Sequence, residues 1–219
     1  MRDSAFPDPR TLSPDDSPVL AYGAVWQPEV IVDAYRHGIF PWPDGDDVWW
    51  WSPDPRMVFM PGDMHISRSL RRTLTRDRFT ISTDQAFSQV VAGCADRSEG
   101  TWITAPMRAA YEHLHELGIA HSIEVWDGRQ LAGGLYGVQT GGAFTGESMF
   151  HRVTDASKVA LVRLSELLAG AGFTLLDAQL PTDHLRSMGG VQLPRDTFLD
   201  LLADAVERDR AFPVVPRSG

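Results

Sequence analysis

Two short segments place polar side chains inside sequence that otherwise predicts buried β-strands. Residues 146–150 read GESMF, and residues 173–179 read FTLLDAQ. A carboxylate in an apolar strand is costly unless it is paired or used, because burial removes the water that stabilises its charge. Glu147, Asp177 and Gln179 are therefore candidate site residues, and their types first suggest acid–base chemistry.

The motifs of several common enzyme classes are missing. None of the seven histidines has a partner at a spacing of four, and His113 and His115 fall on opposite sides of a predicted helix, so we expect no metal site. Ser148 lacks the GxSxG turn of a nucleophilic serine and is expected to be structural or to donate a hydrogen bond. The phosphate loops GxxxxGKS/T and GxGxxG are also absent, so we expect no cofactor.

Composition and charge narrow the class of protein. The chain has 219 residues, of which 43% are hydrophobic, which is enough for one full core and a small second unit. The first residues contain no apolar run, and no later stretch reaches membrane-spanning length, so we expect a cytoplasmic protein without a membrane partner. The net charge of −9 argues weakly against a large nucleic-acid partner.

One basic cluster stands against this acidic background. Its helical spacing can place several arginines on one side, although such a run is as easily a solvated helix face. The cluster consists of Arg68, Arg71, Arg72, Arg76 and Arg78.

Periodicity and turn residues predict the elements that must position these residues. Residues 1–20 are rich in Pro, Asp and Ser and are expected to form a loosely held arm. Residues 39–59 contain prolines that exclude a long regular element, and their four tryptophans are expected to fill a small domain lacking regular structure, to bind a ligand, or both. Elsewhere we expect helices over 28–38, 84–96, 105–118, 155–172 and 195–207, a three-strand antiparallel meander over 121–150, and a buried strand over 173–179.

This order of elements predicts an α+β protein with helices on an antiparallel sheet, a layout that small acyltransferases also use. A coenzyme A enzyme would need a glycine-rich loop between strand and helix, where backbone amides hold the pyrophosphate. The corresponding join reads MFHRVTDASK and contains no glycine. The pattern therefore favours an acyl donor other than coenzyme A.

Ten motifs in order resemble the leucyl/phenylalanyl-tRNA–protein transferase family. The resemblance runs from about Ala34 to Phe198. It implies a small N-terminal domain over residues 1–62, followed over 63–219 by an acetyltransferase-like, GNAT-type domain with a mostly antiparallel sheet flanked by helices. The motifs are AYRHGIFPW, WWSPDPR, HISRSLRR, GTWIT, HELGIAHSIEVW, GGLYGV, GESMF, DASKVAL, DAQ and HLRSMGG.

The resemblance also implies a reaction. Such an enzyme moves Leu or Phe, and less readily Met, from an aminoacyl-tRNA to a protein that begins with Arg or Lys, and so marks that protein for regulated proteolysis. Two alternatives stay open: a peptidoglycan-type transferase that uses the same donor, and a non-catalytic tRNA-binding adaptor.

Residue by residue, the matched motifs imply distinct roles. Gln179 would accept a hydrogen bond from the incoming amine, while Asp177 orients Gln179 or relays charge. Glu147 would contact the 3′-terminal adenosine of the tRNA. Trp42 and Trp102 match aromatic positions near that adenosine and the donor side chain.

The remaining matches concern the donor. Leu135 and Phe144 match the apolar pocket that admits Leu or Phe. The arginines Arg68, Arg71, Arg72 and Arg76 would meet the tRNA backbone, because the acceptor stem must lie somewhere on the protein.

Overall fold

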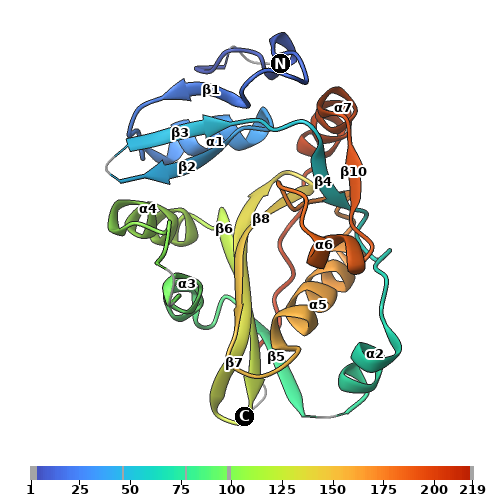
Figure 1. Cartoon of the computed structure of the whole chain (residues 1–219). Coiled ribbons are helices and arrows are strands. Elements are labelled where there is room, and N and C mark those ends of the chain that lie inside the picture. Colours follow the sequence, from blue (N-terminus) through green and yellow to red (C-terminus); the bar gives the residue numbers. More distant parts are fainter. Residues whose placement is uncertain (1–3, 46, 77, 98–99, 218–219) are drawn as a thin grey trace.

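A computed structural model gives the structure of the protein and describes residues 4–45, 47–76, 78–97 and 100–217. Figure 1 shows two sheets, a small one at the N-terminal end and a large one that runs the length of the molecule. Within the described ranges, no helix is both long enough and apolar enough to cross a membrane.

The small sheet contains three antiparallel strands in the order β1-β3-β2, and α1 packs against it. The sequence predicted no regular structure around its prolines, and this was wrong for a physical reason. Pro41 and Pro43 lie in β2, an edge strand, where a missing N–H removes no essential ladder bond. The elements are β1 (Val19–Tyr22), α1 (Pro28–Arg36), β2 (Phe40–Asp44) and β3 (Asp47–Trp51).

From Ser4 onward, the N-terminal arm is held in place rather than loose, which corrects the expectation from composition for the described residues. It includes a short 3-10 helix, Pro9–Thr11. The hydroxyl of Ser4 donates to Asp33 of α1 at 2.9 Å, and the guanidinium of Arg10 donates to Asp200 near the C-terminus at 2.6 Å. These partners lie far away in sequence, so arm composition alone does not reveal them.

The large sheet contains seven strands in the order β10-β4-β9-β8-β7-β6-β5. All neighbours are antiparallel except β8 and β9, which confirms the α+β layout and the predicted meander of β6, β7 and β8. The strand β4 falls within residues 1–62 yet pairs with β9 and β10, and the domain boundary at residue 62 stays a prediction. The strands are β4 (Arg56–Phe59), β5 (Phe79–Thr83), β6 (Ala120–Asp127), β7 (Gln130–Thr140), β8 (Ala143–His151), β9 (Leu175–Asp177) and β10 (Val191–Leu193).

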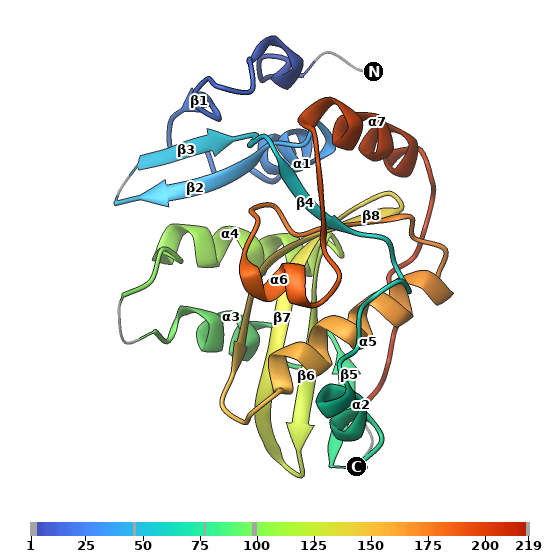
Figure 2. The ribbon, with the colours of Figure 1, turned by 45° about the vertical axis from the view of Figure 1, so that its right-hand side comes forward.

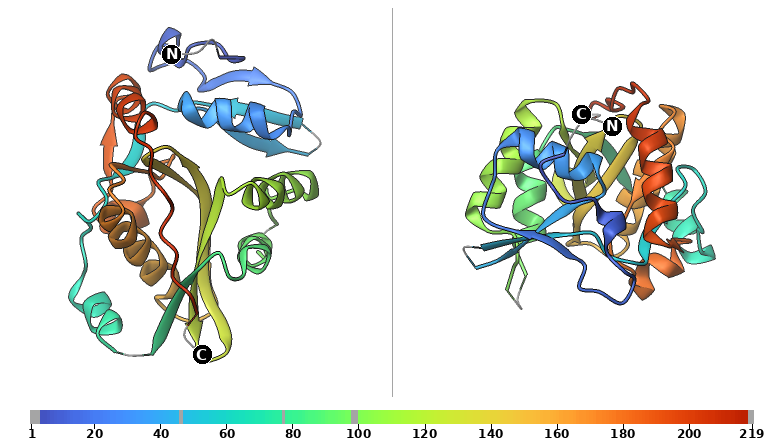
Figure 3. Two further views of the ribbon diagram at one scale, coloured as in Figure 1. Left: turned by 180° about the vertical axis from the view of Figure 1, so that it is seen from behind. Right: turned by 90° about the horizontal axis from the view of Figure 1, so that it is seen from above.

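Helices cover both faces of the large sheet (Figures 1 and 3). The described residues form three apolar clusters: one shared by α1, α3, α4 and the small sheet, one beneath α5, and a smaller one where α7 meets β4, β8 and β9. The long helices occur where the periodicity predicted them. The helices beyond α1 are α2 (Arg68–Leu74), α3 (Phe87–Ala95), α4 (Ala105–Glu116), α5 (Ala156–Gly170), α6 (Asp183–Ser187) and α7 (Arg195–Val206).

Candidate active site

A gap opens where the parallel strands β8 and β9 separate. Their register ends at the pair Thr145 and Asp177. Beyond that point β8 continues along β7, while the backbone of Ala178 and Gln179 bonds Met57 of β4 instead. A cavity of about 120 Å³ lies in this gap, between the two strands, α5 and α6.

A β-bulge directs Glu147 into the site. Tyr136 of β7 pairs with Ser148, and the next residue, Gly137, pairs with Gly146, so Glu147 is the extra residue on β8. A bulge changes the direction of a side chain relative to the regular strand alternation. Glu147 lines the cavity and is only 8% exposed.

Three donors hold the Glu147 carboxylate. The hydroxyl of Tyr35 donates to Oε1 at 2.7 Å, that of Tyr111 to Oε2 at 3.1 Å, and Nε2 of Gln179 to Oε1 at 2.8 Å. The two tyrosine hydroxyls also bond each other. Burial raises the pKa of Glu147 to about 7, although the hydrogen bonds from the two tyrosines and Gln179 act in the opposite direction.

Gln179 is fixed in an unusual backbone conformation. Its φ of 61° lies in the left-handed region, which typically costs a non-glycine residue about 1–3 kcal/mol. The backbone N–H of Gln179 donates to Oδ1 of Asp177 at 2.9 Å, and its side-chain amide is held by Glu147. The backbone carbonyl oxygen of Gln179 accepts from Met57. With Nε2 facing Glu147, the side-chain oxygen Oε1 of Gln179 accepts no hydrogen bond from the described part of the chain, so the site presents an open acceptor.

Asp177 is saturated by protein partners. Arg56 binds it in a bidentate pair, with Nε to Oδ1 at 2.8 Å and an η-nitrogen to Oδ2 at 2.6 Å. The same guanidinium donates to the carbonyl of Gly38 at 3.1 Å. Both charged side chains are almost fully buried. Asp177 is therefore placed to hold the backbone of Gln179 rather than to meet a substrate directly.

The cavity wall opposite these polar groups is apolar. The predicted residue Leu135 belongs to it. Phe144, the other residue expected there, is fully buried in the neighbouring core, where its ring stacks on Phe212 with centroids 5.5 Å apart. The apolar side chains that line the cavity are Leu135, Met149, Leu161, Leu164, Leu176, Ala178 and Leu185.

The predicted aromatic pair forms a stack of its own. The rings of Trp42 and Trp102 are nearly parallel, at 9°, with centroids 5.5 Å apart. Trp51 continues the stack on the other side of Trp42 at 5.5 Å. The fold thus brings Trp42 and Trp102 together, but neither lines the cavity that holds Glu147 and Gln179.

The predicted arginines lie on the outer surface at α2. Arg68, Arg71 and Arg72 belong to the helix and Arg76 follows it, and all four are exposed. No ion pair links any of these four to another residue in the described ranges. They are free to meet an external anion.

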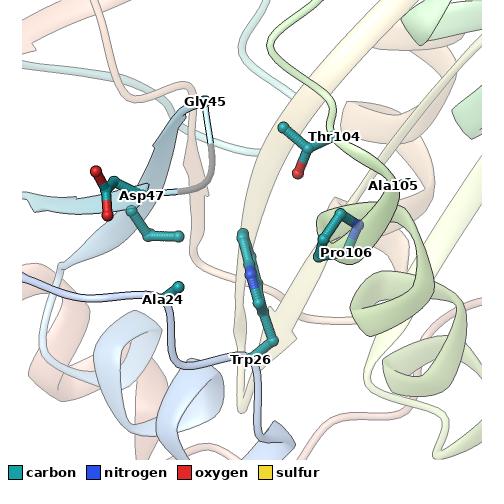
Figure 4. A pocket seen from close by; sticks show the side chains of 8 residues that line it. Ala24, Trp26, Gly45, Asp47, Thr104, Ala105 and Pro106 are labelled. Atoms are coloured by element: carbon teal, nitrogen blue, oxygen red, sulfur yellow. The ribbon is translucent and has the colours of Figure 1, made fainter.

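A second, larger cavity of about 430 Å³ lies between the β2–β3 hairpin and the start of α4 (Figure 4). Trp26 stands between Asp47 on one side and Thr104 and Pro106 on the other. As far as the described residues show, none of the predicted site residues lines it. The smaller cavity, where buried polar groups converge, is therefore the candidate active site.

Sequence reasoning missed three residues of the site: Tyr35, Tyr111 and Arg56. The tyrosines come from α1 and α4, and in sequence they look like ordinary core aromatics. Arg56 could have been singled out from the sequence, because a charged residue directly precedes the apolar run Met57–Phe59. A metal is not suggested by the geometry of the described residues, which contain no group of three His, Cys, Asp or Glu side chains that could hold one.

Comparison with known proteins gives consistent matches. The family model described as "Leucyl/phenylalanyl-tRNA protein transferase" matches residues 58–203, and the one for that protein's N-terminal domain matches residues 27–54. A relative named leucyl/phenylalanyl-tRNA–protein transferase, from Anaeromyxobacter dehalogenans strain 2CP-C, is 51% identical over 94% of this chain and 90% of its own length. A relative of the same name from Stutzerimonas stutzeri strain A1501 is 48% identical over 95% of this chain and 94% of its own length.

Among solved structures, a GCN5-related N-acetyltransferase from Kribbella flavida is similar with a TM-score of 0.40 and 12% identity. That match covers 75% of this chain and 60% of the other.

Proposed function

The chain belongs to the leucyl/phenylalanyl-tRNA–protein transferase family, and we propose that it moves Leu, Phe or, less readily, Met from an aminoacyl-tRNA to a protein that begins with Arg or Lys. The family defines the reaction class, which is aminoacyl transfer from tRNA to the N-terminus of a protein. The choice of amino acids and acceptors, the marking of the product for regulated proteolysis and the cytoplasmic location are parts of the proposal.

The observation that carries the proposal is the open side-chain oxygen, Oε1, of Gln179 beside an apolar cavity. An α-amine has a pKa near 7.7–8.0, so a useful fraction is already neutral at cellular pH. The Gln179 oxygen can accept a hydrogen bond from that amine and direct its lone pair at the ester carbonyl. An amide is not a base, so this contribution is positional and electrostatic.

The proposed reaction needs no cofactor, because every bond formed is matched by a bond broken in the two substrates. The acceptor nitrogen attacks the ester carbonyl, the new C–N bond forms, and the C–O bond to the ribose breaks. The proton lost by the nitrogen leaves with the ribose hydroxyl. Forming an amide from an ester is downhill, so the protein has chiefly to position the reactants and keep water out.

The cavity suits the proposed donor side chains. Its volume of about 120 Å³ is close to that of an engineered apolar cavity of about 150 Å³ that binds benzene. A pocket of this kind discriminates weakly among apolar groups, because one methylene is worth about 1–3 kcal/mol. This supports a range that includes Leu, Phe and Met.

The other predicted residues complete the proposal. Glu147 would accept hydrogen bonds from the terminal adenosine, and the face of the Trp42–Trp102 stack would lie near that base, where stacking is worth about 1–3 kcal/mol. Asp177 would act by fixing Gln179. Phe144 would support the pocket from behind, and the arginines of α2 would meet the backbone of the acceptor stem.

A transfer assay tests the proposal. The protein is incubated with Phe-tRNA and a peptide that begins with Arg, and the same peptide beginning with Ala is the control substrate. We expect a gain of one Phe residue by mass spectrometry on the Arg peptide only. Gln179→Ala should lower kcat by about 100-fold or more, the scale of losing one preorganised hydrogen-bonding group at the reacting centre.

The exposed Gln89 of α3 provides a matched control, because Gln89→Ala should leave kcat unchanged. A wild-type protein that binds Phe-tRNA but caps no peptide would be an adaptor. A protein that transfers Phe only to a cell-wall precursor would be a peptidoglycan-type enzyme. Either result would refute the proposal.

A further inference from the structure

Three basic side chains gather beside the cavity that holds Glu147 and Gln179. Lys158 lies in α5, three residues before Leu161, and residues at that spacing share a helix face. His184 directly precedes Leu185 in α6. Leu161 and Leu185 both line the cavity, so the two elements bring Lys158 and His184 to its edge.

The third basic residue, His151, ends β8 just before α5. Its Nδ1 lies 3.4 Å from the hydroxyl of Ser157, which places it over the first turn of α5. Burial, followed by the charges of Lys158 and His151, lowers the pKa of His184, as expected where cationic groups converge. We call His151, Lys158 and His184 the α5 basic cluster.

Among the residues that the structure describes, one carboxylate contacts this cluster. Asp155 accepts from Nζ of Lys158 at 3.1 Å and from the hydroxyl of Thr73 at 3.2 Å. It therefore offsets part of the charge of Lys158 and also ties α2 to the start of α5. The other nearby acid, Asp183, is paired with Arg186 at 2.7 Å.

The cluster lies between two parts of the proposed donor site. Figure 2 shows α2 and α6 on opposite sides of α5, and the Thr73–Asp155 bond fixes α2 against α5. Basic side chains thus run from the exposed arginines of α2, across the first turn of α5, to α6 at the cavity. A nucleic acid whose stem meets α2 and whose terminal aminoacyl group enters the cavity must cross this surface.

We propose that His151, Lys158 and His184 bind the backbone phosphates of the single-stranded 3′ end of the aminoacyl-tRNA. The inference rests on the proposed function, because it assumes that the aminoacyl group occupies the cavity. The contacts are charge-assisted hydrogen bonds to phosphate oxygens and carry no sequence information. Their role is to fix the path of the strand, so that the terminal nucleotide reaches Glu147.

The test compares donors with and without these phosphates. Lys158→Ala and His184→Ala should each raise the KM for Phe-tRNA roughly 5- to 10-fold, as expected for a partly exposed charge-assisted hydrogen bond. In Lys158→Ala, the slope of log Kd for tRNA against log salt should fall by about 0.7 for each single-strand phosphate that the lost ammonium no longer neutralises. Neither variant should change the KM for 3′-phenylalanyl adenosine, which has no phosphate.

Two further arms define the location of the contact. A tRNA without its single-stranded 3′ nucleotides should bind Lys158→Ala and wild type equally. Arg163→Ala is the matched control, because Arg163 lies on another side of α5 and pairs with Glu166 at 2.7 Å. It should leave every constant unchanged. Lys158→Gln retains more of the stem of the side chain and guards against a packing effect.

Each result is decisive for the proposal. Equal losses with 3′-phenylalanyl adenosine would show that the cluster acts on the adenosine or on folding. Equal losses with the shortened tRNA would place the contact on the stem, and an unchanged Kd and salt slope would show that there is no contact. If the wild type transfers from neither donor, the proposed function fails, while the Kd measurements with intact and shortened tRNA still decide the phosphate contact.

Discussion

The Glu147 carboxylate is held by donors from three separate elements, α1, α4 and the segment after β9. Its burial has a thermodynamic consequence. A carboxyl group whose pKa rises on folding favours the folded state while it is protonated, and it disfavours that state once it ionises. The pKa of Glu147 is raised from 4.5 to about 7, so its contribution to stability is full below pH 4.5 and falls as the pH rises toward 7.

We therefore expect Glu147→Gln to be more stable than the wild type at pH 8 and equally stable at pH 4.5. The side-chain amide keeps the shape and hydrogen-bonding capacity of the protonated acid, and the difference at pH 8 should be at most about 3 kcal/mol. Urea denaturation at the two pH values measures it. A variant that is less stable than the wild type at pH 8 would show that the hydrogen bonds outweigh the burial of charge.

For single residues, the sequence predicted the polar side chains that are costly in strands but not the groups that form hydrogen bonds with them. Glu147, Asp177 and Gln179 stood out because their types conflict with apolar surroundings. Tyr35 and Tyr111 did not, because a tyrosine in an amphipathic helix fits an ordinary core. Their hydroxyls meet Glu147 only through the tertiary fold, which a single sequence does not specify at the level of atoms.

Among the elements, α2 combines a short helix with a dense group of exposed arginines. Its buried residue Leu70 and its N-cap Ser67 account for the helix, and the arginines take no part in either contact. Folding therefore does not explain their number, whereas the proposed contact with a tRNA backbone does.

Reversing the charge of Arg71 and Arg72 tests this role. The double variant Arg71→Glu, Arg72→Glu should raise the KM for Phe-tRNA by at least about 10-fold and reduce the salt slope of binding by about 2, one unit for each phosphate contact. Its Tm should stay close to that of the wild type, because both side chains are exposed. An unchanged KM would mean that α2 is only a solvated helix face.

The elements that sequence reasoning found were those with strong local periodicity. The long helices and the meander have sequence patterns that can be recognised without knowing the tertiary structure, as in residues 156–170. The strands β4, β5 and β10 were missed because each has only three to five residues, too few for a period to appear. The strand β2 was missed because its two prolines argue against a strand unless it lies at an edge, and its partner β3 was missed with it.

In the whole molecule, Arg56 joins parts of the chain that are distant in sequence. Its guanidinium binds Asp177 of β9 and the carbonyl of Gly38, which follows α1. It also lies between the rings of Phe40 and Phe198, at 4.7 and 4.5 Å from their centroids. The small sheet, the large sheet and α7 therefore meet at one buried cation, next to the residue that fixes Gln179.

Removing this cation should destabilise the whole protein. Arg56→Met leaves Asp177 buried without a charged partner, for which we expect a loss of about 3–5 kcal/mol in the free energy of unfolding. Arg56→Lys keeps the charge but loses the bidentate geometry, so its loss should be smaller. The exposed pair of Arg78 and Asp127 supplies the comparison, and Arg78→Met should cost less than about 1 kcal/mol. If urea denaturation gives Arg56→Met and Arg78→Met similar losses, Arg56 does not hold these parts together.

If the losses differ as expected, the folded fraction of Arg56→Lys should also transfer Phe more slowly than the wild type, because Asp177 would no longer fix the backbone of Gln179 in its left-handed conformation.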